Sequence, residues 1–264
     1  MQVNAWSLTG SMGLVWGGRK LTFVGAEPFG ETMRNYIVCV LARVIGFVMA
    51  LALSVAALAS VINGLGTSAE LMLRQMERFA PSAVTLLPES EYPGMATMIT
   101  GYLDGTVDMF QYSFRGDGDV QFLAFHDYEQ QHMADCRELF VLDRSVLLIS
   151  VVIACVMIVA AMVMKDARRV TGGFLAGVLL VILAAMAVGI WGLVDFEGLF
   201  ILFHHLSFDN GLWLLNPATD LLIRLMPTAF FMDYAVKLVI GWGVSLLMMA
   251  GASAGMLLAW KHKR

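Results

Sequence analysis

Charged residues are scarce in this sequence. Only 14% of its 264 residues are Asp, Glu, Lys or Arg, whereas 59% are hydrophobic, which is far more apolar than an average soluble domain. No tract rich in Lys and Arg of the kind that binds nucleic acid is present, so nucleic acid is excluded as an expected partner. The composition therefore indicates an integral membrane protein.

Cysteine is also rare. The three cysteines, Cys39, Cys136 and Cys155, lie far apart in the chain. Their spacing matches neither a disulfide framework nor a structural zinc site. Cross-links and structural zinc are therefore not expected to hold the fold together.

Long apolar runs are what the sequence has instead. Four runs reach the roughly 20 residues that a helix needs to cross a bilayer, and they are residues 37–62, 145–164, 170–194 and 236–260. The remaining segments are a tail over 1–36, a hydrophilic segment over 63–144, a short loop over 165–169, an amphipathic segment over 195–235 and a second tail over 261–264. We predict an all-α polytopic membrane protein with four transmembrane helices.

Basic residues fix the expected orientation, because cytoplasmic loops carry the excess of Lys and Arg. They concentrate in the loop over 165–169 and in the tail over 261–264, whereas acids dominate 63–144 and 195–235. We therefore expect both termini in the cytoplasm and the two hydrophilic segments outside. A rival hypothesis takes 57–59, Ala-Leu-Ala, as a signal-peptidase site, but it leaves the sidedness of the other runs unchanged.

The outer segment over 63–144 is expected to form a small mixed α/β domain. Its sequence predicts helices over 70–79 and 95–103, and the Gly-Asp-Gly-Asp turn at 116–119 predicts a small hairpin. The stretch 125–137 is expected to begin the second membrane helix.

The second outer segment is too polar in its centre to span a bilayer. Asn216 is expected to cap a short amphipathic helix whose first position is Pro217 and which Pro227 stops. Such a helix suits a membrane surface or the top of a helical bundle.

Two short motifs allow structural explanations. Residues 251–255, Gly-Ala-Ser-Ala-Gly, match the nucleophile pattern of serine hydrolases, but that pattern needs a strand-to-helix turn and here lies deep in an apolar run. Small residues four apart, here and at Gly173 and Gly177, favour close helix packing instead. The second and third runs carry no ionisable residue, which argues against coupled ion transport.

Histidines supply the remaining candidate chemistry. Glu129 and His132, three residues apart, lie on one helical face, and such a pair can bind metal. A zinc hydrolase that uses His132, His204 and a carboxylate is one hypothesis. Alternatively, Glu129 and Asp135 orient His132 or form a solvated acidic face.

Two stretches together resemble the bacterial lipoprotein intramolecular transacylase family. They are Glu-Gln-Gln-His-Met-Ala-Asp at 129–135, and Phe-His-His-Leu-Ser-Phe at 203–208 with Trp213 and the following Leu222, Ile223, Pro227, Phe230 and Phe231. The stretch Gly-Tyr-Leu-Asp-Gly at 101–105 also fits the outer domain of that family. The resemblance covers roughly residues 37–260, and the N-terminal tail has no counterpart in it.

The resemblance implies a catalytic pair, His132 and His204, and a reaction that needs no cofactor and no metal. An acyl chain would move from the sn-2 position of a diacylglyceryl-modified cysteine to the α-amino group of that cysteine, which yields a lyso-form lipoprotein. The partners would be such lipoproteins and membrane lipids.

Four aromatic residues are expected to bind substrate: Tyr102, Phe203, Phe208 and Trp213. Supporting roles are expected for Glu129 and Asp135. Which histidine acts as base stays open at this point, as does a non-enzymatic lipoprotein-binding protein.

Overall fold

The computed structural model describes residues 12–16, 19–23, 29–115 and 121–262. Four of its helices are long and apolar enough to cross a membrane, as the sequence predicts. They are α1 (Phe29–Gly66), α5 (Asp127–Met164), α6 (Ala167–Val194) and α9 (Thr228–His262). The fold class is that of an all-α polytopic membrane protein.

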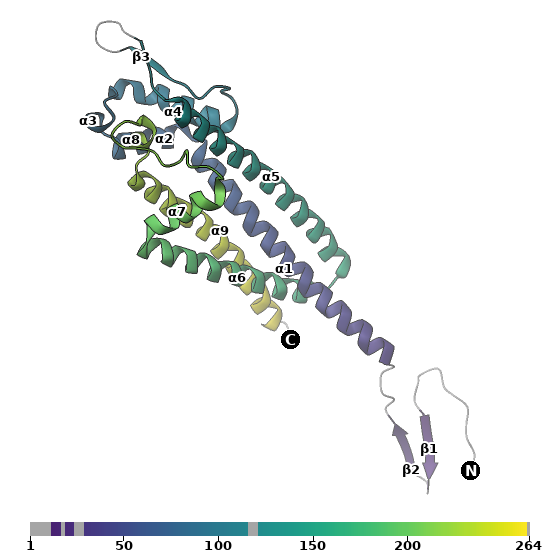
Figure 1. Ribbon diagram of the computed structural model, residues 1–264. Coiled ribbons are helices and arrows are strands. Elements are labelled where there is room, and N and C mark those ends of the chain that lie inside the picture. The colour runs from purple at the N-terminus through teal and green to yellow at the C-terminus, as the bar shows by residue number, and fades with distance from the viewer. Residues whose placement is uncertain (1–11, 17–18, 24–28, 116–120, 263–264) are drawn as a thin grey trace.

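Helix α1 occupies the middle of this bundle (Figure 1). It packs against α5, α6 and α9, and 39% of its most apolar stretch is buried, compared with 6% to 17% in the other three. The outward faces of α5, α6 and α9 carry exposed Val, Leu, Ile and Met side chains. A surface this apolar suits contact with lipid chains rather than with water.

Glycines bring α1 and α6 into close backbone contact. A Cβ atom added at Gly46 would collide with the carbonyl oxygen of Val170, and one added at Gly173 would collide with that of Arg43. A Cβ atom at Gly177 would lie 2.8 Å from the Cβ atom of Ala50. The predicted close packing at Gly173 and Gly177 is therefore confirmed.

The prediction of close packing is wrong for Gly251 and Gly255. No atom lies within 4 Å of a Cβ atom added at Gly251 or Gly255, so neither glycine is required by a neighbouring helix. Ser253 lies inside α9, and its hydroxyl donates to the carbonyl of Met249 at 2.7 Å. The helical context agrees with the rejection of this serine as a nucleophile.

All four long helices extend beyond the predicted apolar runs. Helix α1 begins inside the predicted tail 1–36, and α5 continues outward well beyond 145. Hydropathy marks only the part of a helix that tolerates hydrocarbon. Packing of Met133 in the core of the outer domain accompanies the extension of α5, whereas the first turns of α1 are exposed. The turn between α5 and α6 is short, because Lys165 takes a left-handed conformation (φ 53°) and the Asp166 carboxylate accepts from the amide of Arg169.

The predicted N-terminal tail also contains two strands. They are β1 (Met12–Trp16) and β2 (Arg19–Phe23), which pair antiparallel with Met12 opposite Phe23. The scattered charges and glycines of this stretch gave no sustained alternation from which the strands could be predicted.

The outer region between α1 and α5 is a small domain of short elements. They are α2 (Ala69–Phe79), α3 (Ser82–Thr85), a 3₁₀ turn η1 (Glu89–Glu91), α4 (Tyr92–Asp104), β3 (Ser113–Arg115) and β4 (Gln121–Leu123). Both predicted helices are present, and β3 pairs antiparallel with β4 as the hairpin prediction requires. The predicted turn residues themselves, 116–119, lie outside the described residues.

The core of this domain is completed by a distant part of the chain, which precedes α9. Helix α8 (Leu221–Leu225) inserts Leu221, Leu222 and Leu225 among Met76, Tyr92 and Ile99 of α2 and α4. In Figure 1 these elements gather at one end of the bundle, above α1 and α9.

The prediction of a helix that starts at Pro217 is wrong. Asn216 accepts from the amide of Ala218 at 3.0 Å, and its own amide donates to Asp220 at 2.7 Å. These bonds close a turn over 217–219, and α8 starts only at Leu221. It ends before Pro227, where the prediction placed the stop.

A further helix, α7 (Phe196–Ser207), starts immediately after α6. The carboxylate of Asp195 accepts from the amide of Gly198 at 2.8 Å and caps the new helix. Helix α7 turns back from the end of α6 (Figure 1). It carries His204 back toward the outer part of α5.

Candidate active site

His132 of α5 and His204 of α7 lie side by side. Their ring centroids are 6.3 Å apart with the planes inclined by 29°, and each residue is only 8% exposed. This separation is short enough for both rings to act on one substrate group, as shared proton chemistry requires.

The hydrogen bond of His204 fixes its tautomer. Its Nδ1 atom lies 2.7 Å from the carbonyl oxygen of Phe200, one turn earlier in α7. Because a carbonyl can only accept, Nδ1 carries the proton, and the neutral ring keeps a lone pair on Nε2. Burial lowers the pKa of His204, as does the nearby His205, although the bond to Phe200 acts in the opposite direction. The neutral form thus prevails at pH 7.

The surroundings of His132 are different. Its Nε2 atom lies 3.7 Å from the sulfur of Cys136, one turn further along α5. Its Nδ1 atom is buried and has no hydrogen-bond partner among the described residues. A buried polar atom without a partner is costly, so a group of the substrate that bonds Nδ1 would relieve this cost.

Aromatic rings surround the pair. The Phe208 ring lies 5.1 Å from His132 and 5.6 Å from His204, and Trp213 lies 4.9 Å from His204. Phe203 contacts His204 at 5.4 Å. The three aromatic residues predicted from the second histidine motif are therefore grouped at the pair.

Phe200, which sequence reasoning missed, approaches His204 more closely, at 4.2 Å between ring centroids. Its spacing of four from His204, like that of Cys136 from His132, places it on the same helical face. This spacing of four residues indicates a shared face only if 196–207 is helical, and the sequence did not predict a helix there.

Tyr102 lies elsewhere. Its ring packs against Phe110 at 5.2 Å and against the guanidinium of Arg137 at 4.8 Å, and it is 7% exposed. None of its ring contacts within the described residues is with His132 or His204. Its position in the outer-domain core points to a packing role for the 101–105 motif.

Glu129 is fully buried and is not a solvated acid. One carboxylate oxygen accepts from the amide of His126 at 2.8 Å, and the other accepts from the amide of Leu222 at 2.8 Å. Glu129 therefore caps the start of α5 and ties it to the start of α8. These bonds occupy its carboxylate with backbone donors.

Two further links join α5 to the chain after α7. Asp135 accepts from the side-chain amide of Asn210 at 2.9 Å, and the Tyr128 hydroxyl donates to the buried Asp220 at 2.5 Å. With Glu129, these contacts hold the segment 208–222 against the outer turns of α5. His204 is thereby held beside His132 although α7 itself is a separate helix.

The described residues around the histidine pair do not provide a set of ligands for a metal ion. Within the described ranges, no three His, Cys, Asp or Glu side chains cluster as a bound metal ion would require. The zinc hypothesis therefore lacks a third ligand beside the two histidines.

Comparison with known families yields one match that covers most of the chain. The family model described as lipoprotein intramolecular transacylase Lit matches residues 45–231, which include both histidines. No curated protein matches the sequence.

Solved structures of the membrane-integral lipoprotein intramolecular transacylase Lit from Bacillus cereus share the fold. One aligns with a TM-score of 0.68 at 18% identity, covering 85% of this chain and 99% of that one. A second, in which a histidine is replaced by arginine, aligns with a TM-score of 0.68 at 16% identity over 89% and 100% of the two chains. A third, in which a histidine is replaced by alanine, aligns with a TM-score of 0.65 at 18% identity, covering 88% of this chain and 100% of that one.

Proposed function

Since the chain belongs to the lipoprotein intramolecular transacylase family, we propose that it moves an acyl chain within a bacterial lipoprotein. The chain would pass from the sn-2 oxygen of the diacylglyceryl-modified N-terminal cysteine to the α-amino group of that cysteine. The product is a lyso-form lipoprotein with an N-acylated cysteine.

The observation that carries the proposal is the stacked pair of buried imidazoles, 6.3 Å between centroids. Amine and ester belong to the same substrate, so the enzyme mainly holds them together. Effective molarities of well-oriented intramolecular reactions reach about 10⁵ M or more. A Ser or Cys nucleophile is therefore not required.

His204 is suited to act as the base. Its Nδ1–H donates to Phe200, so Nε2 offers a lone pair in a fixed direction. When the neutral amine attacks the ester carbonyl carbon, the C–N bond forms and the amine loses a proton to Nε2. The carbonyl oxygen of the ester becomes an oxyanion in the tetrahedral intermediate.

His132 is suited to act as the donor. A thiol is protonated at neutral pH, and the Cys136 S–H can donate to Nε2 of His132 at 3.7 Å. The ring proton then resides on Nδ1, the buried atom without a described partner. From there it can stabilise the oxyanion and protonate the glycerol oxygen as the C–O bond breaks. The charged His204 then passes its extra proton to His132, which has lost one, so that both rings are neutral again. The net reaction converts an ester and an amine to an amide and a hydroxyl group.

The acyl chain has an apolar surface beside the pair. Phe208 and Trp213 pack on the imidazoles, whereas Phe203 is 51% exposed and the neighbouring Leu206 is 78% exposed. This exposed face of α7 suits access from lipid. The basic segments 165–169 and 261–264 adjoin the start of α6 and the end of α9, whereas the site follows the end of α6 and precedes the start of α9. Since basic segments favour the cytoplasmic side, we place the site on the outer side of a bacterial cell membrane.

Alanine at His132 or at His204 tests the assignment. Each variant should lose lyso-form product by at least about 100-fold in a lipoprotein-producing host, measured by mass spectrometry of the lipoprotein N-terminus. His205→Ala and Ser253→Ala serve as controls and should retain product. Wild-type product levels in either His132→Ala or His204→Ala would refute the mechanism.

The purified protein should also convert a diacylated lipopeptide to its N-acyl isomer without ATP, acyl-CoA or added metal. Stoichiometric zinc together with loss of activity on chelation would favour the hydrolase hypothesis instead. Tight lipopeptide binding without acyl movement would favour a lipoprotein-binding protein.

A further inference from the structure

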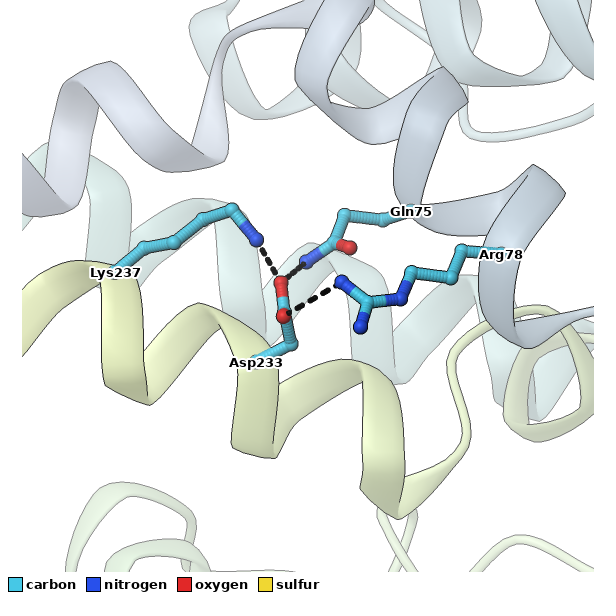
Figure 2. A network of polar contacts seen from close by, with 4 residues as sticks. All are labelled: Gln75, Arg78, Asp233 and Lys237. Carbon is cyan, nitrogen blue, oxygen red and sulfur yellow. Dashed lines mark hydrogen bonds and ion pairs between the residues drawn. The ribbon is translucent and has the colours of Figure 1, made fainter.

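A second group of charged side chains lies where α2 meets α9, centred on Asp233. The Asp233 carboxylate accepts from Gln75 at 2.5 Å and from Arg78 at 3.2 Å, and Lys237 also donates to it (Figure 2). Gln75 is 2% exposed, so the carboxylate is positioned from inside the fold. Arg78 and Lys237 share one negative charge and therefore retain donors for a second anion.

Gln75, Arg78 and Lys237 also line a cavity of about 580 Å³. Three of its lining residues are cations and one is an acid, and the lining consists of Leu71, Arg74, Gln75, Glu77, Arg78 and Lys237. The cavity lies apart from both histidines in the sequence and uses none of the residues assigned to the reaction.

The cavity lies at the outer boundary of the membrane region. Lys237 stands at the beginning of the predicted span 236–260, and α2 starts three residues after α1 ends. Cationic side chains at this depth meet lipid phosphates. A phosphate-bearing ligand is therefore available where the cations are.

An apolar strip runs from Lys237 toward the bilayer centre. Ile240, Val244 and Leu247 follow Lys237 on one helical face and are 60%, 51% and 66% exposed. A ligand that ends in phosphate and continues as a hydrocarbon chain matches both features. Free phosphate would use only the first of them.

The charges around the cavity balance. Arg74 pairs with Glu70 at 3.3 Å, Arg78 and Lys237 pair with Asp233, and Glu77 adds a negative charge to the lining. A headgroup that carries both signs suits such a site better than one with negative charge alone.

We propose that this cavity binds a membrane phospholipid with a phosphoethanolamine headgroup. The phosphodiester lies between Arg78 and Lys237, the primary ammonium meets Glu77, and one acyl chain follows Ile240 and Val244. Bound there, the lipid bridges α2 of the outer domain and α9 of the bundle.

Native mass spectrometry of the full chain tests this. The detergent-solubilised protein is incubated with vesicles of equal phosphatidylethanolamine, phosphatidylglycerol and phosphatidylcholine. Wild-type protein should retain phosphatidylethanolamine preferentially, and the variant with both Arg78→Gln and Lys237→Gln should retain about fivefold less. Arg168→Gln, an exposed cation at the opposite end of the bundle, is the matched control and should retain wild-type amounts.

Glu77→Gln is a second variant at an exposed position, where loss of folding is not expected. It should keep phospholipid but lose the preference for ethanolamine over choline. Equal retention of all three lipids by the wild type, or unchanged retention in the double variant, would overturn the proposal. Displacement of the lipid by soluble phosphoethanolamine at a comparable concentration would also overturn it, because the apolar strip would then contribute nothing.

Discussion

At the scale of single residues, the two histidines differ in what fixes their tautomers. His204 is fixed by a backbone carbonyl, which cannot be removed by substitution at another side chain. Among the described residues, the ring of His132 has the thiol of Cys136 as its one hydrogen-bond partner. The site therefore depends on Cys136 more than its weak hydrogen bond alone would suggest.

We expect Cys136→Ala to lower kcat about tenfold, which corresponds to the loss of one modest hydrogen bond in the transition state, with KM little changed. Cys136→Ser should recover most of the rate, because a hydroxyl also donates to Nε2 of His132. Nitrogen NMR of labelled histidine should show the Nδ1–H tautomer in wild type and its loss in Cys136→Ala. Equal kcat in wild type and Cys136→Ala would remove this role.

The second residue-scale prediction concerns pH. Burial lowers the pKa of His204 from its usual 6.5, so protonation is less favourable in the folded state than in the unfolded one. The stability due to the neutral ring is fully present above about pH 6.5 and is lost as pH falls toward the lower folded pKa.

Unfolding temperatures should therefore fall more steeply between about pH 7 and pH 5 in wild type than in His204→Gln, which does not titrate. Differential scanning fluorimetry in detergent measures both. Parallel curves of unfolding temperature against pH would show that His204 does not contribute to the loss of stability at low pH.

At the scale of elements, the contact between α1 and α6 is the most demanding one. A Cβ atom at Gly173 meets the backbone of Arg43, whereas a Cβ atom at the adjacent Gly172 meets nothing within 4 Å. The two neighbouring glycines thus form a matched pair for substitution.

Gly173→Ala should destabilise the protein by roughly 1 to 3 kcal/mol, because the helices must separate. Gly172→Ala should be neutral or stabilise by up to about 1 kcal/mol through helix propensity. Thermal unfolding of both variants in one detergent gives the comparison. Similar unfolding temperatures would mean that α1 and α6 are not packed this closely.

The same scale shows where sequence reasoning reached its limit. Apolar runs predicted four spanning helices, and turn residues predicted the hairpin of β3 and β4, because these signals are local. The turn at 217–219 depends on Asp220, whose carboxylate also accepts from Tyr128, and such a long-range partner leaves no periodic pattern. Helix α7 was missed as an element because a single capped break at Asp195 separates it from α6.

For the site, the motifs predicted which residues lie together, and the roles of these residues stay predictions. His132, His204, Phe203, Phe208 and Trp213 are brought together. The motif around Tyr102 belongs to the outer-domain core, and Glu129 bonds backbone amides. A residue in a family motif can be needed for packing or for catalysis, and a single sequence does not distinguish the two.

At the scale of the whole molecule, the orientation in the membrane is a prediction from charge. Both termini and the turn at 165–166 should lie in the cytoplasm, and the outer domain should lie outside. In cells of a cysteine-free variant, Thr106→Cys should react with a membrane-impermeant maleimide, whereas Arg168→Cys should react only after lysis. The opposite pattern would invert the assignment and move the histidine pair to the cytoplasmic side.

The glycine contacts of α1 have a consequence for the order in which the protein is made. Gly46 is synthesised long before its partner Val170 exists, and the whole domain between α1 and α5 is synthesised in between. Until α6 is synthesised, the groove at Gly46 faces lipid or the translocation machinery. Assembly of the bundle is therefore a late event in biogenesis, and a nascent chain arrested before residue 170 would hold its central helix without its closest neighbour.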